Sequence, residues 1–179
     1  METIYFTGYH GVGKTMIGKI LSGRKNLKYI DIDSFIEEKE SKNLDEIVNA
    51  HGIDYLMNLG KYTLKNSISQ GMVVSLNADQ VADEENRHTI KKSGRVIYLR
   101  AKTLTIYNNL QEDYKNIPTL KNAFTIFNIE KEVEKLKPYY EELENYIVDI
   151  DDKNINEVAT EVIAIYNFIN KKKCHIFIK

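Results

Sequence analysis

The chain has 179 residues, of which 42% are hydrophobic and 28% are charged, with only 9 glycines and 2 prolines. This composition excludes collagen-like, low-complexity and disordered chains, and the length is sufficient for one domain with a substantial core. The formal net charge is −1 and there is a single cysteine, so no overall field favours nucleic acid or anionic lipid, and no internal disulfide or multi-cysteine metal site can form.

Strand and helix patterns alternate along the chain. Short runs rich in β-branched and aromatic residues predict five strands, at residues 4–7, 29–32, 72–76, 96–99 and 146–150. Apolar residues at helical spacing predict helices at residues 14–21, 35–42, 45–51, 55–69, 82–93, 103–110, 129–145 and 154–170. Strands that alternate with helices indicate a three-layer α/β sandwich around a parallel sheet.

Particular residues predict the shape of two helices. Asp33 and Ser34 can cap the helix that follows the second strand. Pro138 lies inside the charged helix over residues 129–145. Because proline removes a hydrogen bond from the helix interior, we expect a kink or a break there.

No repeat or linker marks a second domain, so we expect one domain over residues 1–170. Within it, residues 111–128 have weak periodicity and contain Pro118, which indicates a mobile excursion. Residues 171–179 read KKKCHIFIK, and we expect a frayed C-terminal tail. The expected assembly is a monomer or a weak homodimer.

The sequence also carries signals of location. No apolar run approaches the roughly 18 residues that a membrane helix needs. The N-terminus leads directly into the strand-like residues 4–6, without the basic region and cleavage site of a secretory signal. We therefore expect a cytoplasmic protein with no membrane or nucleic-acid partner.

Residues 8–15 read Gly-Tyr-His-Gly-Val-Gly-Lys-Thr and fit G-x-x-x-x-G-K-[ST] at every fixed position. A predicted strand precedes this motif and a predicted helix follows it, which is the context that phosphate binding requires. The glycines allow torsions and close approaches that a Cβ forbids. Backbone N–H groups can then form a nest for phosphate oxygens at the positive end of the helix.

This phosphate loop predicts binding of ATP or GTP together with Mg²⁺. Lys14 would reach the β- and γ-phosphates, and the Thr15 hydroxyl would ligate the metal. The nucleotide-binding residues that we assign are Gly8, Gly11, Val12, Gly13, Lys14, Thr15 and Met16. His10 could face the γ-phosphate or an acceptor, although the motif allows any residue there. The alternative is a glycine-rich turn that binds nothing.

Two carboxylates flank Ile32 at the end of the second predicted strand. Residues two apart in a strand point the same way, so Asp31 and Asp33 would emerge together at the carboxyl edge of the sheet, where open α/β sheets bind ligands. One could hold Mg²⁺ through water, and the other could orient an acceptor hydroxyl or take its proton. Alternatively, Asp33 is only a helix cap and Asp31 a solvated strand end.

The phosphate loop followed by YIDIDSFIEE at residues 29–38 resembles shikimate kinase. The likeness covers nearly the whole chain and includes LDEI at 44–47, ENR at 85–87, KPYYEE at 137–142 and VDID at 148–151. The resemblance implies a five-stranded parallel sheet of the nucleoside-monophosphate-kinase type. It also implies transfer of the γ-phosphoryl group of MgATP to a hydroxyl of shikimate.

The resemblance implies roles for individual residues. Lys14 would bind the phosphates, and Thr15 would bind Mg²⁺. Asp31 would hold the metal through water, and Asp33 would contact the acceptor hydroxyl. Lys14 and Asp33 are thus the candidate catalytic residues. The loop after Asp151 would lie near the adenine.

The resemblance implies that the excursion at about residues 111–128 is a lid, and the chain departs from the family at the acceptor site and in the region of this lid. The family has two arginines that bind the acceptor carboxylate, and this chain has Met57 and Leu136 at their positions. Gly60 replaces a glutamate that pairs with the first of them, and Asn109 and Ile117 replace two arginines of the lid region. A triple glycine of the family is replaced by Asn77, Ala78 and Asp79. One arginine that stabilises the transition state of phosphoryl transfer can be worth roughly 10³–10⁵ in rate. The departures therefore predict a weak shikimate kinase at best, and a less anionic hydroxyl compound fits the acceptor site better.

Lysines could replace the arginines in part. Lys61 lies one helical turn after Met57, and Lys115 and Lys121 lie in the lid segment. Lysine offers a point charge without the planar fork of arginine, so any replacement would be partial. The alternative is that all three are solvated surface lysines.

The sequence is compatible with three functions. The first is a kinase that uses ATP and Mg²⁺ to phosphorylate a small-molecule hydroxyl acceptor. The second is a degenerate relative that binds nucleotide without kinase activity and acts through a partner. The third, a nucleoside-monophosphate kinase, is disfavoured because the phosphate of its acceptor requires arginines that the lid lacks.

Overall fold

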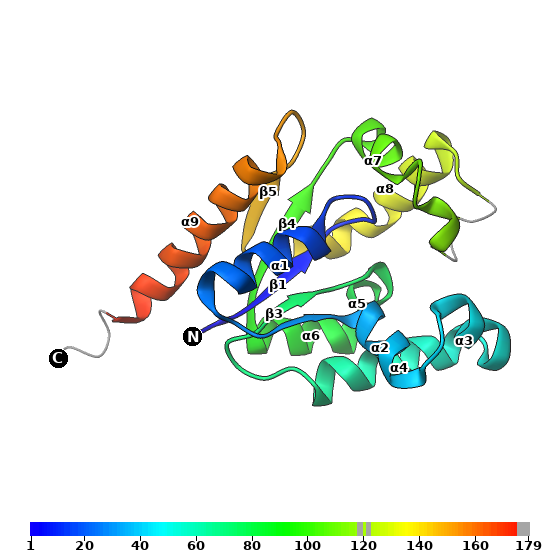
Figure 1. The fold of residues 1–179 in the computed structure, drawn as a ribbon, viewed down its shortest axis with the longest axis horizontal. Coiled ribbons are helices and arrows are strands. Elements are labelled where there is room, and N and C mark those ends of the chain that lie inside the picture. Colours follow the sequence, from blue (N-terminus) through cyan, green and yellow to red (C-terminus); the bar gives the residue numbers. More distant parts are fainter. Residues whose placement is uncertain (118–119, 121–122, 175–179) are drawn as a thin grey trace.

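The computed structural model describes residues 1–117, 120 and 123–174. Its centre is a five-stranded sheet in the order β2-β3-β1-β4-β5, and every neighbouring pair is parallel (Figure 1). The strands are β1 (Thr3–Thr7), β2 (Tyr29–Asp31), β3 (Val73–Ser75), β4 (Gly94–Arg100) and β5 (Tyr146–Asp149). The predicted α/β fold with a five-stranded parallel sheet is confirmed.

Helices cover both faces of the sheet. They are α1 (Lys14–Lys25), α2 (Ile32–Glu40), α3 (Leu44–His51), α4 (Ile53–Asn66), α5 (Ala78–Ala82), α6 (Glu84–Ser93), α7 (Thr103–Leu110), α8 (Ile126–Leu143) and α9 (Ile155–Cys174), with a 3₁₀ turn over Tyr114–Asn116. Helices α1 and α9 pack together on one face, while α6 and α8 lie against β4 on the other (Figure 1). None of the described helices is long and apolar enough to cross a membrane.

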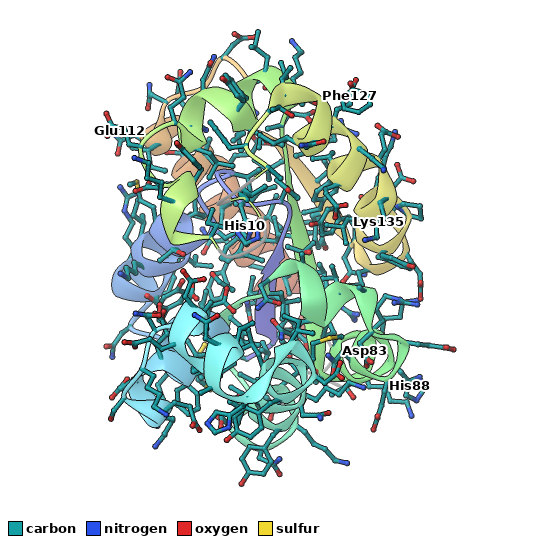
Figure 2. The ribbon with its side chains drawn as sticks, turned by 90° about the vertical axis from the view of Figure 1, so that its right-hand side faces the viewer. His10, Asp83, His88, Glu112, Phe127 and Lys135 are labelled. Carbon is teal, nitrogen blue, oxygen red and sulfur yellow. The ribbon has the colours of Figure 1, made fainter. Side chains whose placement is uncertain are left out.

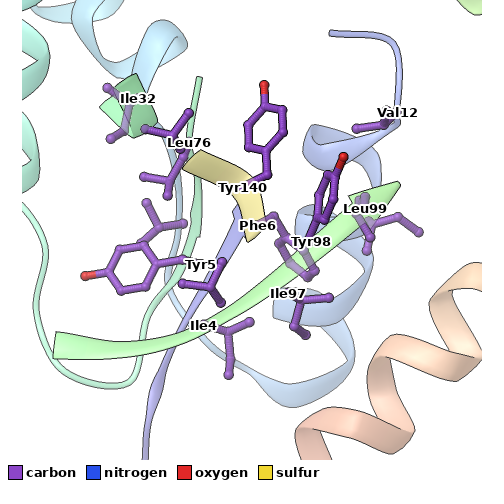
Figure 3. Close-up of a cluster of buried hydrophobic side chains, with 14 of the residues drawn as sticks. Ile4, Tyr5, Phe6, Val12, Ile32, Leu76, Ile97, Tyr98, Leu99 and Tyr140 are labelled. Atoms are coloured by element: carbon purple, nitrogen blue, oxygen red, sulfur yellow. The ribbon is translucent and has the colours of Figure 1, made fainter. Parts of the chain in front are cut away.

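The central strands are buried on both faces, as the continuous apolar run at residues 72–76 predicts. All five residues of β1 and all three of β3 are buried. Tyr5 points toward α6, where its hydroxyl lies 2.7 Å from Ser93 Oγ, and its neighbours Ile4 and Phe6 are fully buried (Figure 3). This rigid core fixes the carboxyl ends of the strands, from which the loops of the site emerge.

The turn from β2 into α2 differs from the prediction. Helix α2 begins at Ile32, so Asp33 lies in its first helical turn and not in the strand. The cap is Asp31, the last strand residue, whose Oδ1 accepts from the Ser34 N–H at 3.4 Å. The prediction that Asp33 and Ser34 cap the helix is therefore wrong. Its physical reason is that the chain passes from strand to helix with no connecting residue, so the cap moves back onto the strand end.

Two other helices agree in part with the prediction. Helix α8 runs continuously from Ile126 to Leu143 with Pro138 inside it, so the break does not occur, and the kink stays a prediction. Leu136 and Tyr140 are buried on either side of the proline, and this packing offsets a cost of about 3 kcal/mol for an interior proline. The predicted helix over 82–93 is present as α6 and begins at Glu84, because Asp83 adopts an extended conformation and caps it, and the short helix α5 precedes it.

The lid and tail are described only in part. The described lid residues contain the 3₁₀ turn and the first turn of α8. Pro118 and Lys121 lie outside the described residues, as do residues 175–179. Helix α9 continues to Cys174, past the predicted end at residue 170. The predicted limits of domain, lid and tail stay predictions.

Candidate active site

The loop between β1 and α1 is shaped by its glycines. Gly8, Gly11 and Gly13 have φ values of +132°, +78° and +83°, which side chains rarely tolerate. A Cβ on Gly8 would lie 2.4 Å from the carbonyl oxygen of Leu99, and one on Gly11 would lie 2.8 Å from Leu110 Cγ. The loop thus closes against β4 and α7 and forms the cradle that the motif predicts.

Replacing Gly8 by alanine is expected to destabilise the fold by about 2–3 kcal/mol, through backbone strain and the clash with the Leu99 carbonyl. Denaturant unfolding measures this difference. Gly23→Ala is the matched control, because Gly23 lies in α1 with open space around it. The control is expected to stabilise by about 0.5–1 kcal/mol. Equal loss of stability in both variants would contradict the role of Gly8.

Lys14 is folded along the inside of this loop. Its Nζ donates to the carbonyl oxygens of Gly8 at 2.7 Å and Tyr9 at 2.8 Å. Burial lowers the pKa of Lys14 to about 8, against the opposing effect of Asp31 and Asp33. Phosphate oxygens are stronger acceptors than these carbonyls because they are charged. The amine is therefore placed to exchange its loop partners for a phosphate.

Thr15 and Asp31 bring oxygen atoms together beside the loop. The Thr15 hydroxyl donates to Asp31 Oδ2 at 2.7 Å, and the Tyr29 hydroxyl donates to the same oxygen at 3.2 Å. Tyr29 is held in turn by Ser75, with 2.9 Å between their hydroxyl oxygens. Hydroxyl and carboxylate oxygens are the ligands that Mg²⁺ prefers. These two residues therefore fit the predicted metal, with the phosphates as further ligands.

Asp33 is bound by Asn77, which follows β3. The Asn77 side-chain amide donates a short hydrogen bond to Asp33 Oδ1. Asn77 Oδ1 also accepts from the Gln80 N–H at 3.0 Å, while the Gln80 side chain accepts from the Asn77 N–H at 3.3 Å. This capping box starts α5 and fixes the amide toward Asp33. Sequence reasoning missed the contact, although N-x-x-Q directly after a strand is a signal for such a box.

These groups surround one cavity of about 700 Å³ at the carboxyl edge of the sheet. Apart from Gly8, which is not in its lining, the predicted nucleotide-binding residues line it, and so do both aspartates of the predicted pair. Asp152 and Lys153, in the loop after β5, form another part of its wall. The structure thus brings the phosphate loop, the aspartates and the predicted adenine loop to one place.

A second cavity of about 550 Å³ adjoins the first. His10, Asp33, Asn77 and Ile117 line both cavities, so Asp33 lies at their junction. Figure 2 faces this side of the molecule and shows His10 at its centre, with Lys135 on the α8 side. Two adjoining cavities with a carboxylate between them suit a reaction that transfers a group from one bound molecule to another.

The sequence is similar to those of known proteins. Residues 10–167 match the family model for shikimate kinase. The chain belongs to the shikimate kinase family. The shikimate kinase of Dictyoglomus turgidum is 32% identical over 90% of this chain and 95% of its own length. That of Sulfurihydrogenibium sp. is 31% identical over 92% and 97%.

Solved structures support the same fold. The shikimate kinase from Acinetobacter baumannii in complex with shikimate has a TM-score of 0.82 at 22% identity, with 93% of each chain covered. That from Aquifex aeolicus has a TM-score of 0.77 at 24% identity, with 90% of this chain and 94% of the other covered.

The positions where this shikimate kinase relative departs from its family can now be placed. Leu136 is 5% exposed and lines the second cavity, and Ile117 lines both cavities. Asn109 Nδ2 donates to the carbonyl oxygen of Gly11 at 2.8 Å, so it braces the phosphate loop. Gly60 packs against the Gln80 side chain, which would meet any Cβ there. Met57 is only partly buried.

The lysines proposed as replacements are engaged elsewhere or lie outside the described residues. Lys61 Nζ lies 2.6 Å from Asp83 Oδ2, at the cap of α6, and Lys61 is not among the residues that line either cavity. Lys115 is exposed and lies over the ring of Tyr114. Lys121 lies outside the described residues, and so does the side chain of Asp79. Lys61 thus matches the alternative of a surface lysine.

His10 is neutral at physiological pH. Burial lowers its pKa to about 3, and the charge of Lys14 acts in the same direction. Its ring packs edge-on against Tyr9 at 5.4 Å. A neutral imidazole at the junction can give or accept one hydrogen bond but adds no positive charge to either cavity.

Proposed function

We propose that this protein is an ATP-dependent kinase that transfers the γ-phosphoryl group to a hydroxyl group of a small acceptor. The observation that carries the proposal is the junction of the two cavities at Asp33, beside a complete phosphate loop. Membership of the shikimate kinase family supports it. We place the protein in the cytoplasm, with a small molecule as its partner.

Each residue has a defined part in this reaction. The loop amides and Lys14 bind the phosphates, and Thr15 and Asp31 hold Mg²⁺, with Asp31 acting through water. When bound, the metal neutralises charge on the β- and γ-phosphates. Asp33 orients the acceptor hydroxyl. The hydroxyl oxygen forms a bond to the γ-phosphorus, the bond to the bridging oxygen of ADP breaks, and the proton passes to Asp33 and then to solvent.

One observation favours a second function, in which the protein binds nucleotide, has no kinase activity and acts through a partner. Among the described residues that line the nucleotide cavity, the cations are Lys14 and Lys153, and Lys153 Nζ pairs with Glu161 at 2.6 Å. Transition-state charge would then have little support from side chains other than Lys14. This alternative predicts saturable nucleotide binding without turnover.

An assay of ADP release separates the two functions. The purified chain would receive MgATP with shikimate, with other polyols and alcohols, or with no acceptor, while calorimetry measures nucleotide binding. If the protein is a kinase, we expect acceptor-dependent turnover above about 1 s⁻¹, the low end of ordinary enzyme rates. Nucleotide binding without stimulation by any acceptor would support the second function. Absence of nucleotide binding at millimolar concentration would overturn both.

A further inference from the structure

We propose that the acceptor is an uncharged alcohol that carries its hydroxyl group on an apolar body. This inference rests on the proposed kinase function and specifies its substrate class. It is drawn from the second cavity, which we call the acceptor cavity. The cavity has a polar end at Asp33, Asn77 and His10, and it extends from there between α3, α4, α5 and α8.

The walls beyond the polar end are largely aliphatic. The aliphatic residues contributed by these four helices are Leu44, Ile53, Leu56, Ala78, Ala82 and Leu136. Ile53 is 46% exposed, so it offers open apolar surface to a ligand. A carboxylate placed against such walls would lose hydration without gaining a hydrogen bond, whereas an apolar body would gain from burial.

The charges of the cavity also balance. Among its described lining residues, Asp33 and Glu132 are acidic, and Lys131 and Lys135 are basic. Lys135 Nζ lies 3.6 Å from Glu132 Oε2, and both lysines are exposed on α8. Exposed lysines give weak, flexible contacts to an anion compared with a bidentate arginine. The described part of the lining therefore offers no surplus of fixed positive charge to an anionic acceptor.

Arg87 is engaged by residues that flank the acceptor cavity and is not itself in the described lining. Arg87 donates through Nε to Glu142 at 2.8 Å and through Nη1 to the carbonyl oxygens of Val81 and Ala82, each at 2.9 Å. Its guanidinium group stacks on the ring of Tyr139 at 4.6 Å. Arg87 thus joins α5, α6 and α8, and its Nε and Nη1 donors are used in these structural contacts.

The polar end suits one hydroxyl group. The carboxylate of Asp33 can accept a hydroxyl proton, and Asn77 already orients that carboxylate. His10, at the same end, is neutral. A few polar groups beside aliphatic walls are the pattern of a site that orients a single polar group, and the other charged and amide residues of the described lining lie along α8. The volume of about 550 Å³ leaves room for a ring.

The direct test compares two acceptors that differ only in charge. Shikimate and its methyl ester share one ring and its hydroxyl groups, and the ester lacks the carboxylate. ADP release by the full chain with MgATP gives kcat/KM for each, and cyclohexanediols and benzyl alcohol extend the uncharged series. We expect the ester to exceed the acid by about tenfold or more, because the acid leaves a charge without a partner.

A charge-introducing variant provides the second arm. Leu136→Arg places a guanidinium in the wall, so it is expected to shift the ratio of ester to acid toward the acid by about tenfold. Leu104→Arg is the matched control, since Leu104 is 58% exposed on α7 and is not in the lining of either cavity. The control is expected to keep the ratio of the unmodified chain.

The outcomes are distinct. A preference for the ester that Leu136→Arg reduces would support the proposal. A preference for shikimate, or for another carboxylated or phosphorylated acceptor, would overturn it while the proposed kinase function stands. Loss of that preference in Lys131→Met would then identify the exposed lysine as the anion-binding group. Saturable nucleotide binding with no turnover of any acceptor would overturn the proposed function itself.

Discussion

Replacing Lys14 by methionine is expected to lower the rate of phosphoryl transfer about 10²–10³-fold, the usual cost of losing one preorganised donor to developing charge. The amine already lies inside the loop, 2.7 Å and 2.8 Å from the Gly8 and Tyr9 carbonyl oxygens. Among the described residues of the nucleotide cavity the other cation is Lys153, which is paired with Glu161. Within the described lining of this cavity, no unpaired lysine or arginine is present to take over the charge of Lys14.

The measurement is acceptor-dependent ADP release under saturating MgATP, with nucleotide affinity from calorimetry. Methionine keeps the length of the side chain, so the loop should fold as before. Lys19→Met is the matched control, because Lys19 is exposed on the same helix. Its rate should equal that of the unmodified chain. A Lys14→Met variant with an unchanged rate would refute the assignment of the phosphate loop.

Replacing Asp33 by asparagine should lower kcat about 10²–10⁴-fold and leave nucleotide affinity nearly unchanged. Asp33 lies where the two cavities meet, and the Asn77 amide holds its Oδ1. Asparagine keeps the size of the side chain but accepts a proton far less readily. The loss should therefore fall on the chemical step and not on binding.

Separate determination of kcat and KM, together with calorimetry of nucleotide binding, checks this expectation. Glu38→Gln serves as the control, since it removes a carboxylate from an exposed position of the same helix. We expect no change of kcat in the control. A loss confined to KM in Asp33→Asn would show that Asp33 binds the acceptor without taking part in proton transfer.

Local sequence patterns predicted much of the fold. Short-range rules suffice for the phosphate loop, because a glycine-rich turn between a strand and a helix has few other conformations. The helix over residues 103–110 has the predicted bounds, and the cap at Asn154 is present, with its Oδ1 accepting from the Asn156 and Glu157 N–H groups at 2.9 Å and 3.2 Å. In each case the signal lies within a few residues of the feature.

Contacts between distant segments were less predictable. The bond of Asn77 to Asp33 joins residues 44 apart in the chain, and the ion pair of Lys61 with Asp83 joins α4 to the cap of α6. Lys61 could only be judged from the sequence by its place one turn after Met57. Which of several neighbours a flexible lysine meets depends on how whole helices pack.

The sequence by itself determined a parallel α/β fold and a phosphate-binding loop, since both follow from local periodicity and from backbone freedom at glycine. It also predicted that Asp31 and Asp33 lie together at the carboxyl edge of the sheet, where both line the nucleotide cavity, although not that the strand ends at Asp31 and the helix begins directly after it. Only the tertiary structure decided the character of the acceptor cavity. Its walls combine α3, α4 and α5 with α8, which is distant from them along the chain, and packing alone brings their apolar side chains together.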